Sequence, residues 1–89
     1  MIDERLVTAL NGQINTEIYS AYLYASMASY LDSVSLPGFS HWMGCQLREE
    51  LAHVERFHEF MRDRGGRVLL TTIEGPPTEW DSPLAVFEQ

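Results

Sequence analysis

Two long apolar stripes with helical spacing constrain this sequence more than any other feature. In residues 3–32, which contain one glycine and no proline, apolar side chains recur at steps of three and four. A second stripe of the same kind runs from Phe39 to Met61. Because helices with one apolar face pack against each other, the pattern predicts an all-α fold built on two long amphipathic helices.

The break between the stripes is short, and it predicts an antiparallel helical hairpin. Pro37 suits the first turn of a second helix, where its missing N–H costs nothing. The pair Gly65 and Gly66 is typical of a helix end. We therefore expect one helix over about 3–32 and another over about 37–64.

The segment after the second helix is expected to cross back along the hairpin. It has no helical period and, up to Pro83, contains three of the four prolines. About 18 connecting residues (about 65–82) can reach roughly 59 Å, whereas a helix of about 28 residues is roughly 42 Å long. Ser82 then suits an N-cap, and residues 83–89 begin a third helix. The whole chain, 1–89, is expected to form one half-bundle of helices.

The amino-acid composition limits the kinds of partner that this protein is expected to bind. The net charge of −7 argues against binding to nucleic acid or to an anionic membrane, and is compatible either with attracting cations or with solubility alone. No stretch approaches the roughly 20 apolar residues of a membrane span. The N-terminus does not resemble a signal peptide, and the single cysteine, Cys45, suits a reducing compartment. We expect a cytoplasmic protein in which Cys45 is a small packing residue.

A carboxylate interrupts each apolar stripe. Glu17 takes one position of the first stripe and Glu50 one position of the second, with His53 beside it. A hairpin folded about residues 34–35 brings position 17 level with position 52, so the three side chains are expected to meet between the helices. An ionised carboxylate buried there costs several kcal/mol unless a partner or a metal neutralises it.

Two carboxylates with one imidazole suit iron or manganese, whereas structural zinc favours thiolates and more histidine. The alternative is a polar network in which Glu17 hydrogen-bonds to Tyr24 and His53. A second Glu-x-x-His copy, Glu55 and His58, is turned by about 140° from the first on a helix. We therefore expect this copy to lie on an ordinary solvated surface.

The residues also resemble a known family. The strings LPGFSHWM, EELAH and PPTEW are similar to the N-terminal half of a bacterial-type non-haem ferritin, and the resemblance covers nearly the whole chain. It implies the first two helices of a four-helix bundle with their long crossover loop. Members of this family bind Fe(II) at a di-iron centre, oxidise it as ferroxidases, and store the ferric mineral inside a shell of many subunits.

The resemblance assigns roles residue by residue. It implies that Glu50 bridges two irons and that Glu17 and His53 hold one of them. Tyr24 matches a tyrosine beside that centre. Glu49 matches a ligand of a nearby third iron site, although spacing alone would place it on the surface.

Haem is not expected, because haem-binding relatives carry a methionine after the second-helix glutamate, where this chain has Leu51. Di-iron sites of this fold take a Glu from each of two helices and Glu-x-x-His from each of two others. The hairpin supplies one of each. Helices missing from this sequence, or self-association into a homodimer or higher oligomer, would complete the centre, with Fe(II) and O2 or H2O2 as substrates. The alternative function is a non-catalytic helical hairpin with relic ligands, whose apolar stripe binds a partner.

Overall fold

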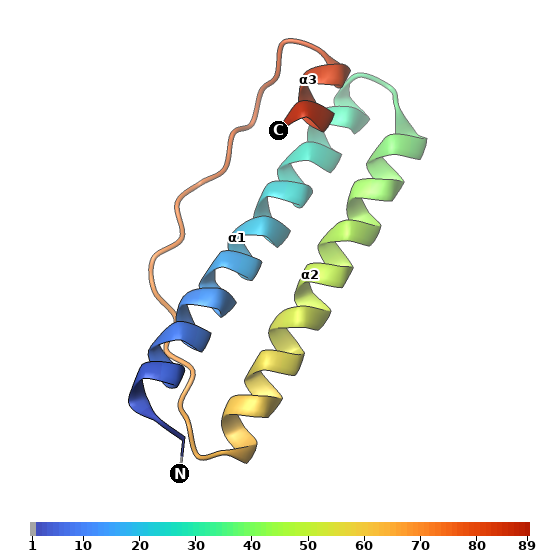
Figure 1. Cartoon of the computed structure of the whole chain (residues 1–89). Helices are drawn as coiled ribbons and strands as arrows, with labels where there is room; N and C mark the ends of the chain where they lie inside the picture. Colours follow the sequence, from blue (N-terminus) through green and yellow to red (C-terminus); the bar gives the residue numbers. More distant parts are fainter. Residues whose placement is uncertain (1) are drawn as a thin grey trace.

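The computed structural model describes residues 2–89, which form three helices and no strand. Helix α1 spans Glu4–Ser33, α2 spans Pro37–Asp63 and α3 spans Pro83–Glu88. Helices α1 and α2 lie side by side and antiparallel in a hairpin (Figure 1), and the molecule is elongated, with extents of 50 × 20 × 17 Å. The all-α hairpin expected from the two stripes is confirmed. Within the described part of the chain, no helix is both long and apolar enough to cross a membrane.

Helix α1 begins at a capped N-terminus. The Asp3 carboxylate accepts a hydrogen bond of 2.7 Å from the backbone N–H of Arg5 and so satisfies a donor that the first turn leaves free. The side-chain hydrogen bond from Arg5, with this backbone bond as the second cause, lowers the pKa of Asp3 below its usual value. Asp3 is therefore an anion at neutral pH, the form that a helix N-terminus stabilises.

Both long helices end in the same way. After α1, the N–H of Leu36 donates to the carbonyl of Leu31 at 2.9 Å, and Ser35 has a φ of 63°. After α2, the N–H of Gly66 donates to the carbonyl of Met61 at 2.8 Å, and Gly65 has a φ of 77°. This pattern is a Schellman motif, which needs one left-handed residue. Glycine takes that position after α2, but serine takes it in the hairpin turn.

Replacing Ser35 by Gly is therefore expected to raise the free energy of unfolding by about 0.5–1 kcal/mol. A left-handed residue with a Cβ costs about 1–2 kcal/mol, and the greater backbone entropy that glycine loses offsets part of this gain. Urea unfolding measures the difference. The control is Ser29→Gly, at an exposed position inside α1, where glycine is expected to cost about 0.5 kcal/mol. A loss of stability in Ser35→Gly would contradict the strain at this turn.

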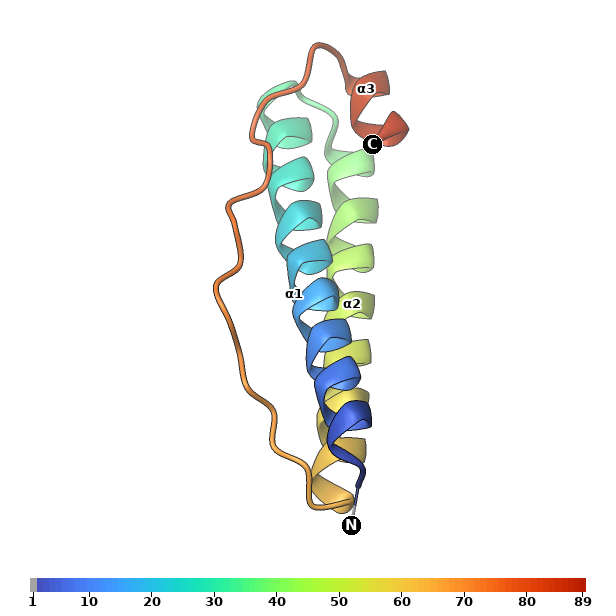
Figure 2. The ribbon, with the colours of Figure 1, turned by 60° about the vertical axis from the view of Figure 1, so that its left-hand side comes forward.

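The connection, residues 64–82, returns along α1 to the other end of the hairpin (Figures 1 and 2). Its first part is held by two asparagines of α1. Asn11 donates to the carbonyl of Arg67 at 3.0 Å and accepts from the N–H of Leu69 at 2.8 Å. Asn15 accepts from the N–H of Thr71 at 3.3 Å. These side chains satisfy backbone groups that an isolated extended segment leaves without partners.

The last part of the connection is held near the hairpin turn. The Ser26 hydroxyl donates to the carbonyl of Pro77. The Trp80 ring packs on the Tyr30 ring with centroids 5.4 Å apart. The chain thus reaches the end of the hairpin where α1 ends and α2 begins, and there α3 starts.

Helix α3 completes the main core cluster. The Ser82 hydroxyl caps it by accepting from the N–H of Ala85 at 3.3 Å. Its one buried residue packs with side chains from both long helices, in a cluster of four buried residues: Met27, Leu31, Met43 and Val86. This cluster fixes the turn end of the hairpin, and Ile14, Ala21 and Met61 are buried outside it.

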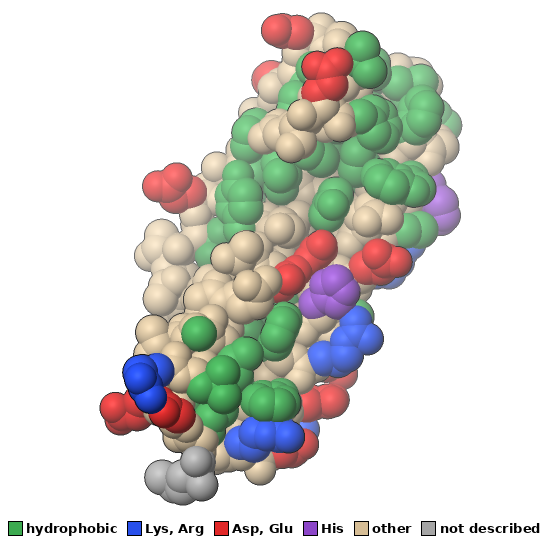
Figure 3. Space-filling view, in the orientation of Figure 1, with side chains coloured by type: hydrophobic (Ala, Val, Ile, Leu, Met, Phe, Trp, Pro, Cys, Tyr) green, Lys and Arg blue, Asp and Glu red, His purple; other side chains and the backbone are tan. Residues whose placement is uncertain are grey.

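Many apolar side chains stay in contact with solvent because two helices cover only one side of each other. Leu6 and Phe39, both members of the stripes, are 43% and 51% exposed. Trp42 and Leu84 are also exposed. Figure 3 shows one face on which hydrophobic side chains gather above and below a central group of acidic and histidine side chains. Exposed apolar patches of this kind are typical of interaction surfaces.

Candidate metal centre

Glu17, Glu50 and His53 meet between α1 and α2, as the hairpin geometry predicts. Each offers one potential ligand atom, and these atoms all lie within 4.8 Å of one another. Glu17 comes from the middle of α1, whereas the other two are one helical turn apart on α2. Three residues from two helices therefore converge on one small volume.

The distances within the group suit a shared ion better than direct hydrogen bonds. Nδ1 of His53 lies 3.5 Å from Oε2 of Glu17 and 3.6 Å from Oε2 of Glu50. Hydrogen bonds between nitrogen and oxygen are shorter, about 2.7–3.2 Å. Ligand atoms at about 2.1 Å from one ion, as in zinc sites, are about 3.0–3.4 Å apart in octahedral or tetrahedral geometry. The two distances from His53 are thus close to those between ligands of one ion, and all three ligand atoms lie within 4.8 Å of one another.

Burial leaves one atom of this group unsatisfied. The Glu17 and Glu50 side chains are 16% and 18% exposed, and His53 is 41% exposed. Oε2 of Glu50 is buried and has no hydrogen-bond partner among the described residues. Leaving such an acceptor unpaired costs about 1–3 kcal/mol. A bound cation would satisfy it, so the three residues fit a metal ion both in donor type and in burial.

Glu17 is held in place by a residue that the sequence reasoning missed. Nε2 of Gln13 donates to Oε1 of Glu17 at 2.9 Å, which leaves Oε2 directed to His53. The i,i+4 spacing of Gln13 and Glu17 could have indicated this hydrogen bond from the sequence, because residues four apart are neighbours on a helix. The alternative network through Tyr24 is not what the structure shows: within residues 2–89, no hydrogen bond joins Tyr24 to Glu17. Tyr24 instead lines a cavity of about 210 Å³ near the turn end, with Trp42 among its neighbours.

The other acidic and histidine candidates lie apart from the group. Glu49 is exposed and is not one of the three residues that converge. Glu55 and His58, the second Glu-x-x-His copy, are both exposed, as expected for a solvated surface. Only the first copy therefore combines with a carboxylate from the other helix.

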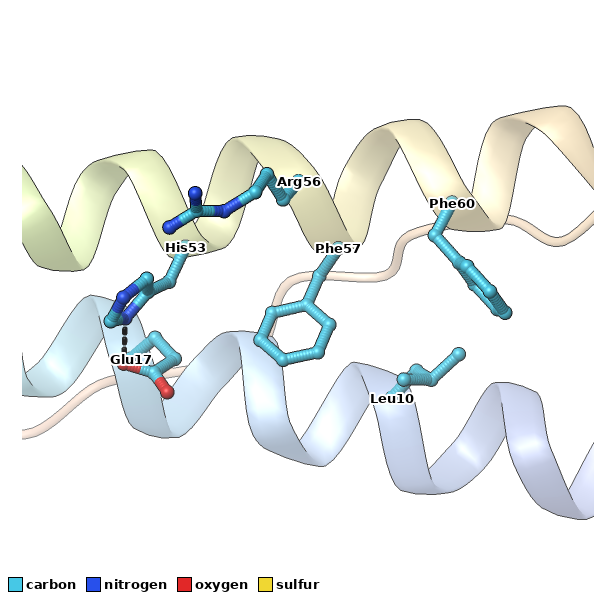
Figure 4. A pocket seen from close by; sticks show the side chains of 6 residues that line it. All are labelled: Leu10, Glu17, His53, Arg56, Phe57 and Phe60. Atoms are coloured by element: carbon cyan, nitrogen blue, oxygen red, sulfur yellow. Dashed lines mark ion pairs between the residues drawn. The ribbon is translucent and has the colours of Figure 1, made fainter.

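An open groove of about 550 Å³ begins at the group and runs along the hairpin. We call it the open groove; its lining residues are Leu10, Glu17, His53, Arg56, Phe57 and Phe60. Figure 4 shows Glu17 and His53 pointing toward each other from the two helices, with Phe57 between them and Phe60. Apolar walls lower the local dielectric constant and so strengthen the interaction of the carboxylates with a cation.

The comparisons with known proteins all point to one family. A family model described as a ferritin-like domain matches residues 7–89. Bacterial non-heme ferritins of Bacteroides fragilis and Staphylococcus saprophyticus are 41% and 39% identical over 88 residues. These matches cover 99% of this chain and 55% and 53% of the two relatives.

Solved structures point to the same family as the sequence comparisons. An open pore ferritin from the hyperthermophilic archaeon Archaeoglobus fulgidus is 61% identical, with a TM-score of 0.95 over 99% of this chain and 54% of that structure. A humanized archaeal ferritin is 58% identical, with a TM-score of 0.95. The chain thus spans about half the length of the relatives that it matches. On the family model, the sequence identities and the shared fold, this chain belongs to the ferritin family.

Proposed function

We propose that the chain binds Fe(II) through Glu17, Glu50 and His53, and that it serves iron storage by oxidising this iron to Fe(III). The observation that carries the proposal is the buried Oε2 of Glu50, which lacks a hydrogen-bond partner beside an imidazole and a second carboxylate. The ferritin family membership supports the choice of iron over manganese.

The ligand charges favour oxidation of the bound iron. Two carboxylates compensate the charge of one Fe(II), and their attraction for the ion increases when it becomes Fe(III). Each Fe(II) releases one electron, so two ions reduce one O2 to H2O2 with the uptake of two protons. With H2O2 as the oxidant, two ions reduce it to two water molecules, again with the uptake of two protons. The role of the protein is to hold the ions and to exclude other ligands.

A single hairpin supplies only half of such a centre, and we propose that a second copy supplies the rest. Two copies related by a two-fold axis would bring together four carboxylates and two imidazoles. The four negative charges would balance two Fe(II) ions. The same contact would cover the apolar walls of the open groove, including Phe60, which is 36% exposed.

Two further residues keep proposed roles that rest on the resemblance alone. Glu49 is exposed and follows Arg48 directly before Glu50, and we propose that it is a ligand of a third iron site near the centre. Tyr24 is partly buried, and we propose that it acts beside the centre without binding the ion itself. Neither role is needed for the binding test that follows.

The test compares the two Glu-x-x-His copies. His53→Ala is expected to weaken Fe(II) binding about a hundredfold or more, since even the loss of a residue that only orients a ligand costs about 10–100-fold. His58→Ala, at an exposed position of the same helix, is expected to bind as the wild type does. Anaerobic titration calorimetry with Fe(II) measures both.

Equal losses in the two variants would refute the assignment of the site. No Fe(II) binding in the wild-type protein would favour the alternative function, in which the hairpin binds a protein partner through its exposed apolar residues. Circular dichroism of each variant checks that the helices remain formed.

A further inference from the structure

A second pair of metal-binding side chains lies on α2, away from the carboxylates. His41 and Cys45 are one helical turn apart, with Nε2 of His41 at 3.7 Å from Sγ of Cys45. His41 is exposed, and Cys45 is partly exposed rather than packed in the core. Cys45 precedes Glu50 by five residues and is therefore turned by about 140° away from it. The pair is separate from the candidate iron site and from the residues that line the open groove.

The separation of the two atoms matches one edge of a tetrahedral site. Zinc binds sulfur at about 2.3 Å and imidazole nitrogen at about 2.0–2.1 Å, which places the two ligand atoms about 3.5–3.6 Å apart. The observed separation of 3.7 Å, which as it stands is a hydrogen-bond contact, is nearly the distance between two ligand atoms of one ion. Pairs of ligands at i and i+4 on one helix face are a known way to hold such an ion.

We propose that His41 and Cys45 form a two-residue site for a thiophilic divalent ion such as Zn(II) or Cd(II). A thiolate with one imidazole selects this class of metal, whereas the oxygen-rich group around Glu17 suits iron. Because both side chains are accessible, water molecules complete the coordination of the ion. The hairpin thus carries two sites with different metal preferences.

Arg48 supports the sulfur ligand. Its Nη2 donates to Sγ of Cys45 at 3.4 Å, one turn further along α2. Such a bond compensates the charge of a thiolate and orients its lone pairs, and it can persist when the sulfur binds a metal. The order along the helix is therefore an imidazole, a thiol and a guanidinium, with the metal between the first two.

The experiment is a titration of the full chain with Cd(II), with a phosphine to keep Cys45 reduced. The ultraviolet sulfur-to-metal charge-transfer band is the readout, because the carboxylate site cannot produce it. We expect the band to saturate at one ion per chain. Cys45→Ser should abolish the band, and His41→Ala should weaken the affinity by at least about tenfold, since the second ligand acts at a high effective concentration.

Matched controls separate this site from the proposed iron site. His58→Ala removes another exposed imidazole of α2, and Glu17→Gln removes an iron ligand; both should keep the band and its affinity. A wild-type protein without the band would overturn the proposal. So would equal affinity in the wild type and His41→Ala, because Cys45 would then bind the ion without its neighbour.

Discussion

Saturation with Fe(II) under anaerobic conditions is expected to raise the melting temperature of the wild-type protein by roughly 10–20 °C. An ion that binds only the folded form stabilises it by about 2.7 kcal/mol at a hundredfold excess over the dissociation constant. For a domain of this size, each kcal/mol shifts the melting temperature by about 4–8 °C. Glu17→Gln is expected to lose most of this shift, because the variant loses a charged ligand.

Without metal, the same variant is expected to melt higher than the wild type, by the equivalent of about 1 kcal/mol. Glu17 and Glu50 place two like charges in a partly buried site, and an amide removes one of them. Glutamine still accepts the hydrogen bond from Gln13. The order of the two melting temperatures, wild type and Glu17→Gln, therefore reverses when metal is added.

Thermal melts by circular dichroism, at one chain concentration and with either EDTA or Fe(II), measure both effects. Mn(II) can replace Fe(II), because oxygen ligands suit it and the His41–Cys45 pair does not. Glu59→Gln, an exposed change on α2, should melt as the wild type does in both conditions. If Fe(II) shifts Glu17→Gln as much as the wild type, the acids do not form a metal site.

The second large effect concerns assembly. We expect the wild-type protein to have at least twice the 10.2 kDa mass of one chain, and Phe60→Asp to be a monomer. Burying one phenylalanine contributes about 2 kcal/mol, and a two-fold interface contains each substituted residue twice. About 4 kcal/mol corresponds to roughly a thousandfold weaker association. Light scattering across a range of concentrations measures the change.

Leu51→Asp is the matched control. Leu51 is also an exposed apolar residue of α2, at 47% against 36% for Phe60, but it does not line the open groove. We expect the Leu51→Asp variant to have the same mass in solution as the wild-type protein. A wild-type chain that is monomeric at 10.2 kDa, and that still melts cooperatively, would rule out the paired centre.

The helices and the meeting of three candidate ligands could be predicted because both depend on periodicity. Apolar spacing defined the two long helices, and the short break required an antiparallel return. The antiparallel return places Glu17 opposite Glu50 and His53 to within one turn of helix. Predicting that these three residues converge requires only the rise per residue of a helix and the position of the hairpin turn.

Details that depend on side-chain conformation could not be predicted. Gln13 holds Glu17, and Oε2 of Glu50 is left without a hydrogen bond, only through the rotamers that the packed hairpin allows. Cys45 was expected to pack as a small apolar residue, because its position lies near the edge of the stripe. Cys45 is partly buried, and its contact with His41 depends on the rotamers of both side chains.

The anchors of the connection also have a practical meaning for protein engineering. Its backbone is held up to Thr71 by asparagines of α1 and again at Pro77 by Ser26. Between these points, Glu74 and Gly75 are exposed, and a Cβ at Gly75 would meet no atom within 4 Å. Exposed positions of this kind tolerate insertions well. A fluorophore or affinity peptide placed at Gly75 would therefore report on assembly while leaving both proposed metal sites and the open groove untouched.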